Sequence, residues 1–341
     1  MDRQQTKSFR LPEEIVNSFR GTDVLITGGQ GYIGSALAQT LANIDCNLTL
    51  LDKSRVNAWM PQEGCAHIST LQGDISMLET WETVLPGMKY VFHLAALEYD
   101  RTEYQIQRDL EVNALPVLHL LEACRKHSLS PLIIFTSSAN IFGRVEKCPV
   151  DEHMRDNPPS LWSIHKLIAE NYLRLYTQQF GIPSVVLRLA NVYGPPVRHE
   201  VISRVILNKM ILRALSGETL TLFDNQNCLR DYIFLQDVIN ALLRAGTSGE
   251  QIHQNPFYII GSGEGKTFAE VWRLIADKVK KRTGKDVPIR VDSSVPIEPI
   301  DCRDFVADTT RFRQVTGWVP QVYLEEGIER TLEAVLQANG R

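Results

Sequence analysis

The chain has 341 residues and a formal net charge of −4, from 36 Lys and Arg against 40 Asp and Glu. This length predicts two domains rather than one, and the charge balance argues against a general nucleic-acid binder. No run approaches ~20 apolar residues, so we expect no membrane contact. The six cysteines are scattered without a C-x-x-C pair, and the histidines show no metal-ligand spacing. We therefore expect free thiols in a reducing cytoplasm, and no metal site.

Short apolar runs alternate with longer amphipathic stretches along the first half of the chain. The runs that predict strands are 23–29, 47–52, 67–73, 90–96, 132–138 and 184–190. The stretches that predict helices are 32–41, 104–127 and 159–180. Strands rich in Val, Ile and Leu without alternation indicate burial on both faces, as in a parallel sheet covered by helices. The sequence therefore predicts an α/β fold with a doubly wound parallel (Rossmann) sheet.

Beyond Asn191 the apolar runs become more widely spaced, which indicates a second, smaller α/β lobe. Helices are predicted at 201–215, 236–245 and 268–281, and strands at 219–223 and 257–260. We expect an N-terminal extension over 1–22, a first domain over 23–190 and a lobe over 191–341. The chain is expected to return to the first domain around 231–262.

A glycine-rich turn follows the first predicted strand and leads directly into a helix. Gly28, Gly31 and Gly34 form a G-x-x-G-x-x-G pattern there. Such glycines permit a tight turn, close approach of the backbone to a pyrophosphate, and a helix N-terminus that faces the phosphates. Asp52 ends the second predicted strand, where a carboxylate accepts both ribose hydroxyls and repels a 2′-phosphate. The pattern predicts a dinucleotide site that prefers NAD to NADP.

Further motifs carry a family resemblance from about residue 23 to residue 336. They are Gly73-Asp74-Ile75, His93-Leu94-Ala95-Ala96, Val112-Asn113-Ala114, the segment Phe135–Gly143, Arg188–Pro195, Arg230–Ile233 and Gly317–Pro320. Together they resemble the extended short-chain dehydrogenase/reductase family of NAD-dependent sugar-nucleotide epimerases and dehydratases. The resemblance implies cofactor contacts by Gly28, Gly31, Tyr32, Ile33, Gly34, Asp52, Asp74, Ile75, Leu94, Ala95, Ala96, Asn113, Thr136 and Lys166.

The catalytic positions implied by the resemblance include one departure from the family pattern. Members use a Tyr-x-x-x-Lys pair on one helix with a Ser or Thr after the fifth strand. Ser138 and Lys166 match this pattern, but Trp162 stands at the tyrosine position. An indole offers an N–H donor and no usable acceptor, so it cannot serve as a general base.

Two interpretations of Trp162 follow. Either the chain has lost or changed its activity, or it keeps the chemistry with another base or with a substrate that needs none there. Glu98, Tyr99 and His165 are the candidates for another base. Ala139 and Asn140 stand where the family's 4,6-dehydratases carry an Asp-Glu pair, which argues against that elimination.

The resemblance also implies a substrate and an assembly. Asn191, Arg230 and Arg303 match positions that hold a nucleotide-sugar diphosphate, and guanidinium groups suit a pyrophosphate. We therefore expect an NAD-dependent sugar-nucleotide epimerase or oxidoreductase that acts by hydride transfer. The alternatives are a catalytically silent NAD- and nucleotide-binding protein and a dehydrogenase of a non-nucleotide substrate. The family commonly pairs the helices matching 104–127 and 159–180 in a homodimer, and Leu118, Leu120, Leu121, Leu173 and Leu175 suggest the same here.

Overall fold

The computed structural model describes residues 11–53, 59–61, 64–97, 105–255, 257–297, 301 and 303–338. Its centre is a seven-stranded sheet with the strand order β10-β6-β5-β4-β1-β2-β3. Every pair of neighbouring strands in it is parallel. The strands are β1 (Asp23–Thr27), β2 (Asn47–Asp52), β3 (His67–Gln72), β4 (Tyr90–His93), β5 (Leu132–Ser138), β6 (Ser184–Leu189) and β10 (Tyr258–Ile260). The predicted doubly wound sheet is confirmed.

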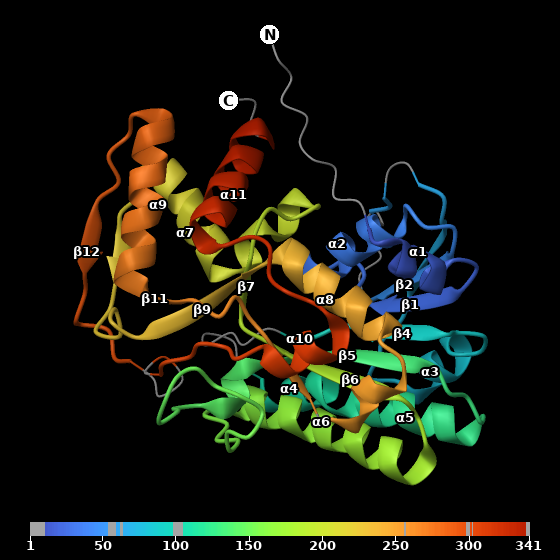
Figure 1. The fold of residues 1–341 in the computed structure, drawn as a ribbon. Helices are drawn as coiled ribbons and strands as arrows, with labels where there is room; N and C mark the ends of the chain where they lie inside the picture. Colours follow the sequence, from blue (N-terminus) through green and yellow to red (C-terminus); the bar gives the residue numbers. More distant parts are fainter. Residues whose placement is uncertain are drawn as a thin grey trace.

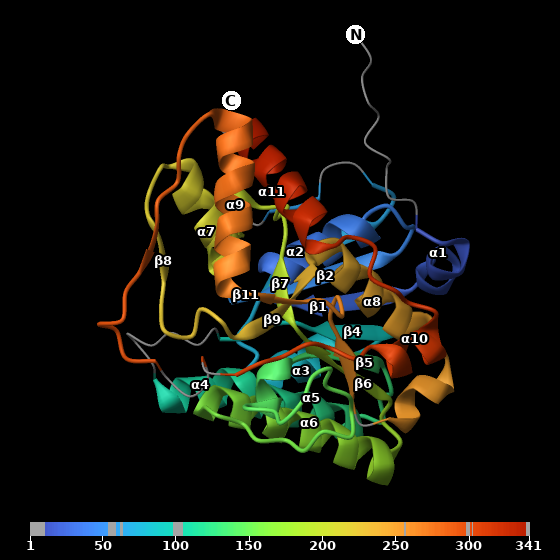
Figure 2. The ribbon, with the colours of Figure 1, turned by 60° about the vertical axis from the view of Figure 1, so that its left-hand side comes forward.

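Helices cover both faces of this sheet, as Figures 1 and 2 show. On one face lie α1 (Glu13–Phe19), α2 (Tyr32–Leu41) and α8 (Leu235–Thr247). On the other face lie α3 (Leu78–Val84), α4 (Ile106–Asn113), α5 (Leu115–Lys126) and α6 (Leu161–Phe180). Two short 3-10 helices, η1 (Ala139–Phe142) and η3 (Glu250–Gln254), follow β5 and α8, and α10 (Thr310–Thr316) packs beside β10.

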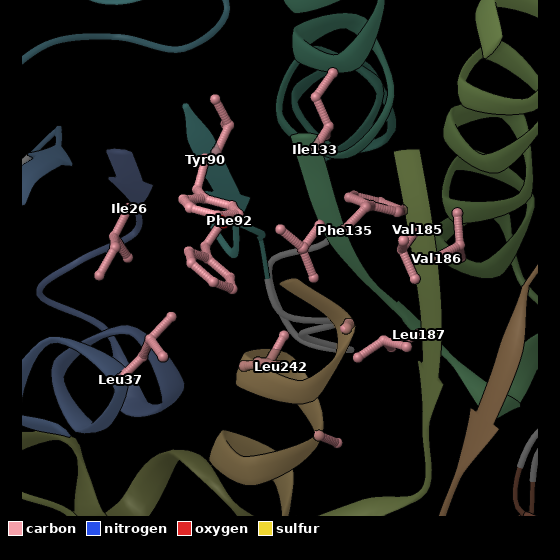
Figure 3. Packing of buried hydrophobic residues seen from close by; sticks show 14 of the residues in the cluster. Ile26, Leu37, Tyr90, Phe92, Ile133, Phe135, Val185, Val186, Leu187 and Leu242 are labelled. Carbon is pink, nitrogen blue, oxygen red and sulfur yellow. The ribbon is translucent and has the colours of Figure 1, made fainter. Parts of the chain in front are cut away.

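The sheet and these helices enclose one large apolar core. Phe92 of β4, Phe135 of β5 and Leu187 of β6 are almost completely buried in it. Figure 3 shows Leu37 of α2 and Leu242 of α8 approaching the sheet from the same side. Because the strands are buried on both faces, their sequences show apolar runs rather than alternation.

Three predicted segments differ in detail from the structure. The stretch predicted as one helix over 104–127 is two helices, because the backbone leaves the helical region at Ala114 (φ −124°, ψ −51°). Pro116 lies in the first turn of α5, where its missing N–H costs no hydrogen bond. The helix predicted over 201–215 is likewise divided at the extended Val205 into η2 (His199–Arg204) and α7 (Ile206–Leu215). The N-terminal extension contains α1, which buries Ile15 and Phe19 against the first core.

A smaller lobe with its own core stands beside the carboxyl ends of the large sheet (Figure 2). It holds a three-stranded sheet of β7 (Asn191–Tyr193), β9 (Leu229–Phe234) and β11 (Gly265–Thr267), and a pair of β8 (Leu220–Leu222) and β12 (Ile289–Val291). The helices α7, α9 (Phe268–Thr283) and α11 (Leu324–Ala338) pack around them. In the segment expected to return to the first domain, β9 belongs to the smaller lobe, whereas α8 packs on the large sheet and β10 pairs with β6.

Candidate active site

A cavity of about 530 Å³ opens at the carboxyl ends of β1 and β4. The strand order reverses between these two strands, and open α/β sheets bind their ligands at such a point. The cavity is lined by Gly28, Gly31, Tyr32, Ile33, Gly34, Asp52, Asp74, Ile75, Leu94, Ala95, Ala96, Thr136 and Lys166, together with Ser138 and Trp162. Of the predicted cofactor residues, Asn113 alone is not part of this lining.

The glycine turn at one wall of the cavity leaves no room for side chains. Gly28 has a φ of +68°, and a Cβ added to it would lie 2.9 Å from the Ala95 backbone. A Cβ on Gly34 would lie 2.1 Å from the Gly28 carbonyl oxygen. Helix α2 begins directly after Gly31, which has no side chain to cap the first N–H groups. These groups therefore face the cavity and fit the pyrophosphate of NAD.

The charges around Asp52 fit the adenosine ribose of NAD rather than NADP. The Asp52 carboxylate accepts a hydrogen bond from the Gln30 backbone N–H at 3.3 Å. The Lys53 ammonium lies 2.8 Å from Asp74. Burial by itself would raise the pKa of Asp74, but hydrogen bonds from Lys53 and Ser76 outweigh it and hold the pKa at about 2. Because Asp74 neutralises Lys53, a 2′-phosphate would meet the negative charge of Asp52.

Ser138, Trp162 and Lys166 meet at the opposite end of the cavity. Ser138 ends β5, and its hydroxyl oxygen accepts from the Asn140 N–H at 3.1 Å, so its own hydrogen can point to a ligand. Lys166 is 3% exposed, and its Nζ donates to the Thr136 carbonyl oxygen at 3.3 Å. Burial lowers the pKa of Lys166 from 10.5 to about 8, although the charges of Asp109 and Glu170 oppose the shift.

The indole of Trp162 is held by the backbone of the loop after β4. Its Nε1 donates to the Leu97 carbonyl oxygen at 2.8 Å. Asn113 holds the same residue, since its side chain accepts from the Leu97 N–H and donates to the Leu97 carbonyl, both at 3.2 Å. Asn113 thus fixes the loop that lines the cavity instead of facing a ligand itself. The Trp162 ring centroid lies 6.0 Å from Lys166 Nζ, as expected for residues four apart on a helix.

Of the three proposed alternative bases, the structure places only His165, and it does not bring His165 to this end of the cavity. His165 is buried between α6 and α4, where its Nδ1 lies 2.5 Å from an Asp109 carboxylate oxygen, and it does not line the cavity. Glu98 and Tyr99 lie outside the residues that the structure describes.

Two of the three predicted substrate residues line a small pocket, and the third does not. Asn191 and Arg303 line a small pocket of about 60 Å³ that shares Ser138, Leu189 and Ala190 with the large cavity. Arg230 lines neither of these two cavities, and its guanidinium donates to the carbonyls of Leu229, Asp301 and Arg303. Burial and then the neighbouring charge of Arg230 lower the pKa of Arg303 to about 9. Two guanidinium groups this close favour an anionic ligand.

A buried ionic network that the motifs did not predict holds α6 against the sheet. Arg188 Nη2 lies 2.7 Å from Glu170, and its Nη1 lies 2.5 Å from Asp156. The Ser137 hydroxyl donates to Glu170, and the Phe257 ring centroid lies 3.5 Å from the guanidinium of Arg188. Glu170 follows Lys166 by one helical turn and Ser137 precedes Ser138, so the network fixes the two predicted catalytic residues relative to each other. The position of Glu170 one turn after Lys166, and of Ser137 directly before Ser138, was the sequence signal that could have indicated this network.

Within the part of the chain that the structure describes, no group of three or more His, Cys, Asp or Glu could hold a metal ion. No helix in the same part is long and apolar enough to cross a membrane.

Comparisons with known proteins agree with this geometry. The chain is 29% identical over 323 residues to UDP-glucose 4-epimerase of Mycolicibacterium smegmatis, a match that covers 91% of this chain and 97% of the relative. It superposes with a TM-score of 0.81 and 28% identity on UDP-glucose 4-epimerase of Thermotoga maritima, solved with UDP-glucose, covering 93% of this chain and 100% of that one.

The Thermus thermophilus UDP-glucose 4-epimerase, solved with NAD, gives a TM-score of 0.74 and 28% identity, and the match covers 92% of this chain and 98% of that one. The family model "NAD dependent epimerase/dehydratase family" matches residues 24–261, which is more than half of the chain. The chain therefore belongs to the NAD-dependent epimerase/dehydratase family of enzymes, which corresponds to the extended short-chain dehydrogenase/reductase family that the motifs indicated.

Proposed function

We propose that the protein binds NAD in the large cavity and transfers a hydride at a sugar carbon of a nucleotide-sugar. The observation that carries this proposal is the junction of the two pockets at Ser138. The cavity that leads from the glycine turn ends there, and the small pocket of Asn191 and Arg303 begins there. A substrate whose diphosphate lies near Arg303 would place its sugar beside Ser138 and Lys166.

The described residues fit distinct parts of this reaction. Bound NAD would supply the two-electron acceptor for the sugar C–H bond. The glycine turn and Asp52 would hold its pyrophosphate and ribose, and Ser138 would donate a hydrogen bond to the reacting sugar oxygen. Arg303 would neutralise the diphosphate, and Arg230 supports the backbone that carries Arg303. Direct contact of Arg230 with substrate, as the sequence predicts, would require its guanidinium to leave the carbonyls that it binds.

A further cavity in the smaller lobe suits the base of the nucleotide. Its volume is about 370 Å³, and Met210, Phe223, Phe268 and Trp272 line it together with Asp301. The guanidinium of Arg230 lies 5.0 Å from the Phe268 ring centroid, so this cavity adjoins the two arginines. Aromatic and apolar walls suit a planar base, and the arginines beside them suit its diphosphate.

The test is turnover of a panel of sugar nucleotides by the purified, NAD-loaded protein. Epimerised or oxidised product, detected by NMR, together with competition by the free nucleoside diphosphate, would support the proposal. Turnover without such competition would favour a non-nucleotide substrate. Tight binding of NAD and nucleotide without turnover would favour the silent binding protein.

Two finer expectations accompany this function. Exposed apolar side chains on α6, among them Leu161, Ile164 and Leu175, fit the expected homodimer. Leu120, Leu121 and Leu173 do not contribute, because they are buried within the single chain. Free cysteines at Cys46, Cys65, Cys124, Cys148 and Cys228 fit the reducing cytoplasm.

A further inference from the structure

We propose that Lys166 itself is the general base of the reaction, in the role that a tyrosine would otherwise fill. This inference rests on the proposed function, because it assigns the proton acceptor for the same hydride transfer. Three observations carry it: the state of Trp162, the titratable groups that line the cavity, and the surroundings of the Lys166 ammonium.

Trp162 can neither accept nor donate the reacting proton. Its indole has no usable acceptor, and its Nε1–H is engaged by the Leu97 carbonyl oxygen at 2.8 Å. Its side chain nevertheless lines the cavity next to Lys166, four residues further along α6. The tyrosine position is therefore occupied by a group without proton chemistry, and the next group on the same helix face is the lysine.

Lys166 is the titratable group suited to proton exchange among the described residues that line this end of the cavity. Asp52, Lys53 and Asp74 lie at the adenosine end. Arg108 and Arg204 also line the cavity, but a guanidinium group offers donors and no acceptor. The Tyr32 hydroxyl donates to the Gly194 carbonyl oxygen at 2.7 Å, and burial raises the pKa of Tyr32.

Two histidines lie near Lys166 but face elsewhere. His93 is buried at the carboxyl end of the central strand β4 with Nδ1 2.8 Å from the Thr27 hydroxyl, and burial lowers the pKa of His93 to about 3. His165 is paired with Asp109 away from the cavity. Neither imidazole lines the cavity, so neither can take a proton from a ligand bound there.

The surroundings of Lys166 allow its ammonium to release a proton. The carboxylates that face it, Asp109 from α4 and Glu170 from α6, form no ion pair with it; they bind His165 and Arg188 instead. Within the described part of the chain, its Nζ has one hydrogen-bond partner, the Thr136 carbonyl oxygen, and the Phe135 ring centroid lies 4.9 Å away. Burial lowers the pKa of Lys166 to about 8, which leaves a usable neutral fraction near neutral pH.

The proposed step moves one proton and one hydride away from the same C–O–H group. The substrate O–H bond breaks, and its proton passes to neutral Nζ, directly or through one water, to give an ammonium. Bound NAD, held by the glycine turn and Asp52, would accept the hydride from the same carbon, so the carbon would lose two electrons and become a carbonyl. Ser138 donates to the reacting oxygen throughout. Return of both proton and hydride reverses the step and would complete an epimerisation.

Lys166→Arg separates a base from a residue that only positions the cofactor. The guanidinium keeps the charge and can bind ribose hydroxyls, but it does not release its proton. We expect NAD affinity within a few-fold of the unmodified protein and a kcat at least ~100-fold lower. Lys280→Arg is the matched control, because Lys280 pairs with Asp286 on the outside of α9. It should change neither quantity.

Two further readouts test proton transfer. In the unmodified enzyme kcat should rise with pH through about 8, because the neutral amine is the active form. In the NAD-free protein, NMR should show the Lys166 ammonium losing its proton near the same pH. Alkylamines added to Lys166→Ala should restore turnover more strongly as their basicity rises.

A kcat for Lys166→Arg within tenfold of that of the unmodified enzyme would overturn the assignment of Lys166. A kcat that no longer rises with pH in Glu98→Gln would overturn it as well. In both cases turnover by the unmodified enzyme would leave the proposed function intact. Absence of turnover by the unmodified enzyme with every sugar nucleotide would overturn both.

Discussion

Replacing Lys166 by Met should make the protein without NAD more stable at neutral pH. The folded chain holds this lysine with a pKa of about 8 instead of 10.5. Each unit of a pKa shift corresponds to ~1.4 kcal/mol, so keeping the lysine charged in its buried position costs about 3 kcal/mol of folding free energy. Loss of the hydrogen bond to Thr136 offsets about 1 kcal/mol of this gain. The expected net stabilisation is therefore about 2 kcal/mol.

The pH dependence follows from the sign of the shift. A lysine with a lowered pKa costs the full amount below pH 8, where both the folded and the unfolded chain carry the proton. Between pH 8 and 10.5 the unfolded chain binds more protons than the folded chain, so the stability of the unmodified protein rises and the cost disappears. Urea unfolding of both proteins without NAD, at pH 7 and near pH 10, measures this directly. A Met variant that is less stable at pH 7, or a gain that is equally large near pH 10, would refute the reasoning.

Four further predictions concern other parts of the site. In the intact protein we expect NAD to bind at least about tenfold (~1.4 kcal/mol) more tightly than NADP in calorimetry. Asp52→Ala should lower the affinity for NAD and reduce this ratio. Equal affinities for NAD and NADP in the intact protein would contradict the assignment of Asp52 to the ribose. Glu170→Ala should lower the free energy of unfolding in urea by about 3–5 kcal/mol, because it removes a partner of buried Arg188. A loss below 1 kcal/mol would show that the ionic network contributes little to stability. In Trp162→Tyr the new phenol should share the proton with Lys166, so turnover below pH 8 should rise and the pH dependence of kcat should flatten. An unchanged pH dependence of kcat would contradict a common position of the phenol and Lys166 at the substrate. Light scattering at micromolar protein should give the mass of two chains, and a concentration-independent monomer would count against a dimer.

Much of the first domain could be predicted because local and global signals agree there. Apolar runs without alternation, glycines between a strand and a helix, and Asp52 at a strand end each have one common structural explanation. The cavity accordingly collects nearly all the predicted cofactor residues. Short strands such as β11 and β12 could not be predicted, since three residues carry too little pattern and their pairing depends on distant partners.

Three of the predicted site residues have protein partners that the sequence could not show. Sequence spacing gives the face of a helix but not the neighbour that meets it, so His165 could be expected near a substrate although Asp109 of α4 holds it. The family resemblance implies ligand contacts for Arg230 and Asn113 from their positions in matched motifs, whereas in the structure their side chains bind backbone carbonyls. The pKa of Lys166 could not be predicted at all, because it depends on burial and on which carboxylates are already paired.

The central claim is hydride transfer between a nucleotide-sugar and NAD in this cavity. The most direct measurement mixes the NAD-loaded protein with a sugar nucleotide whose ring carbons carry deuterium, and follows reduced nicotinamide by absorbance and deuterium by mass spectrometry. The account predicts that reduced nicotinamide forms and that one deuterium is found on the dinucleotide. Bound NAD that stays oxidised and free of deuterium with every sugar nucleotide, at any pH between 7 and 9, would contradict it.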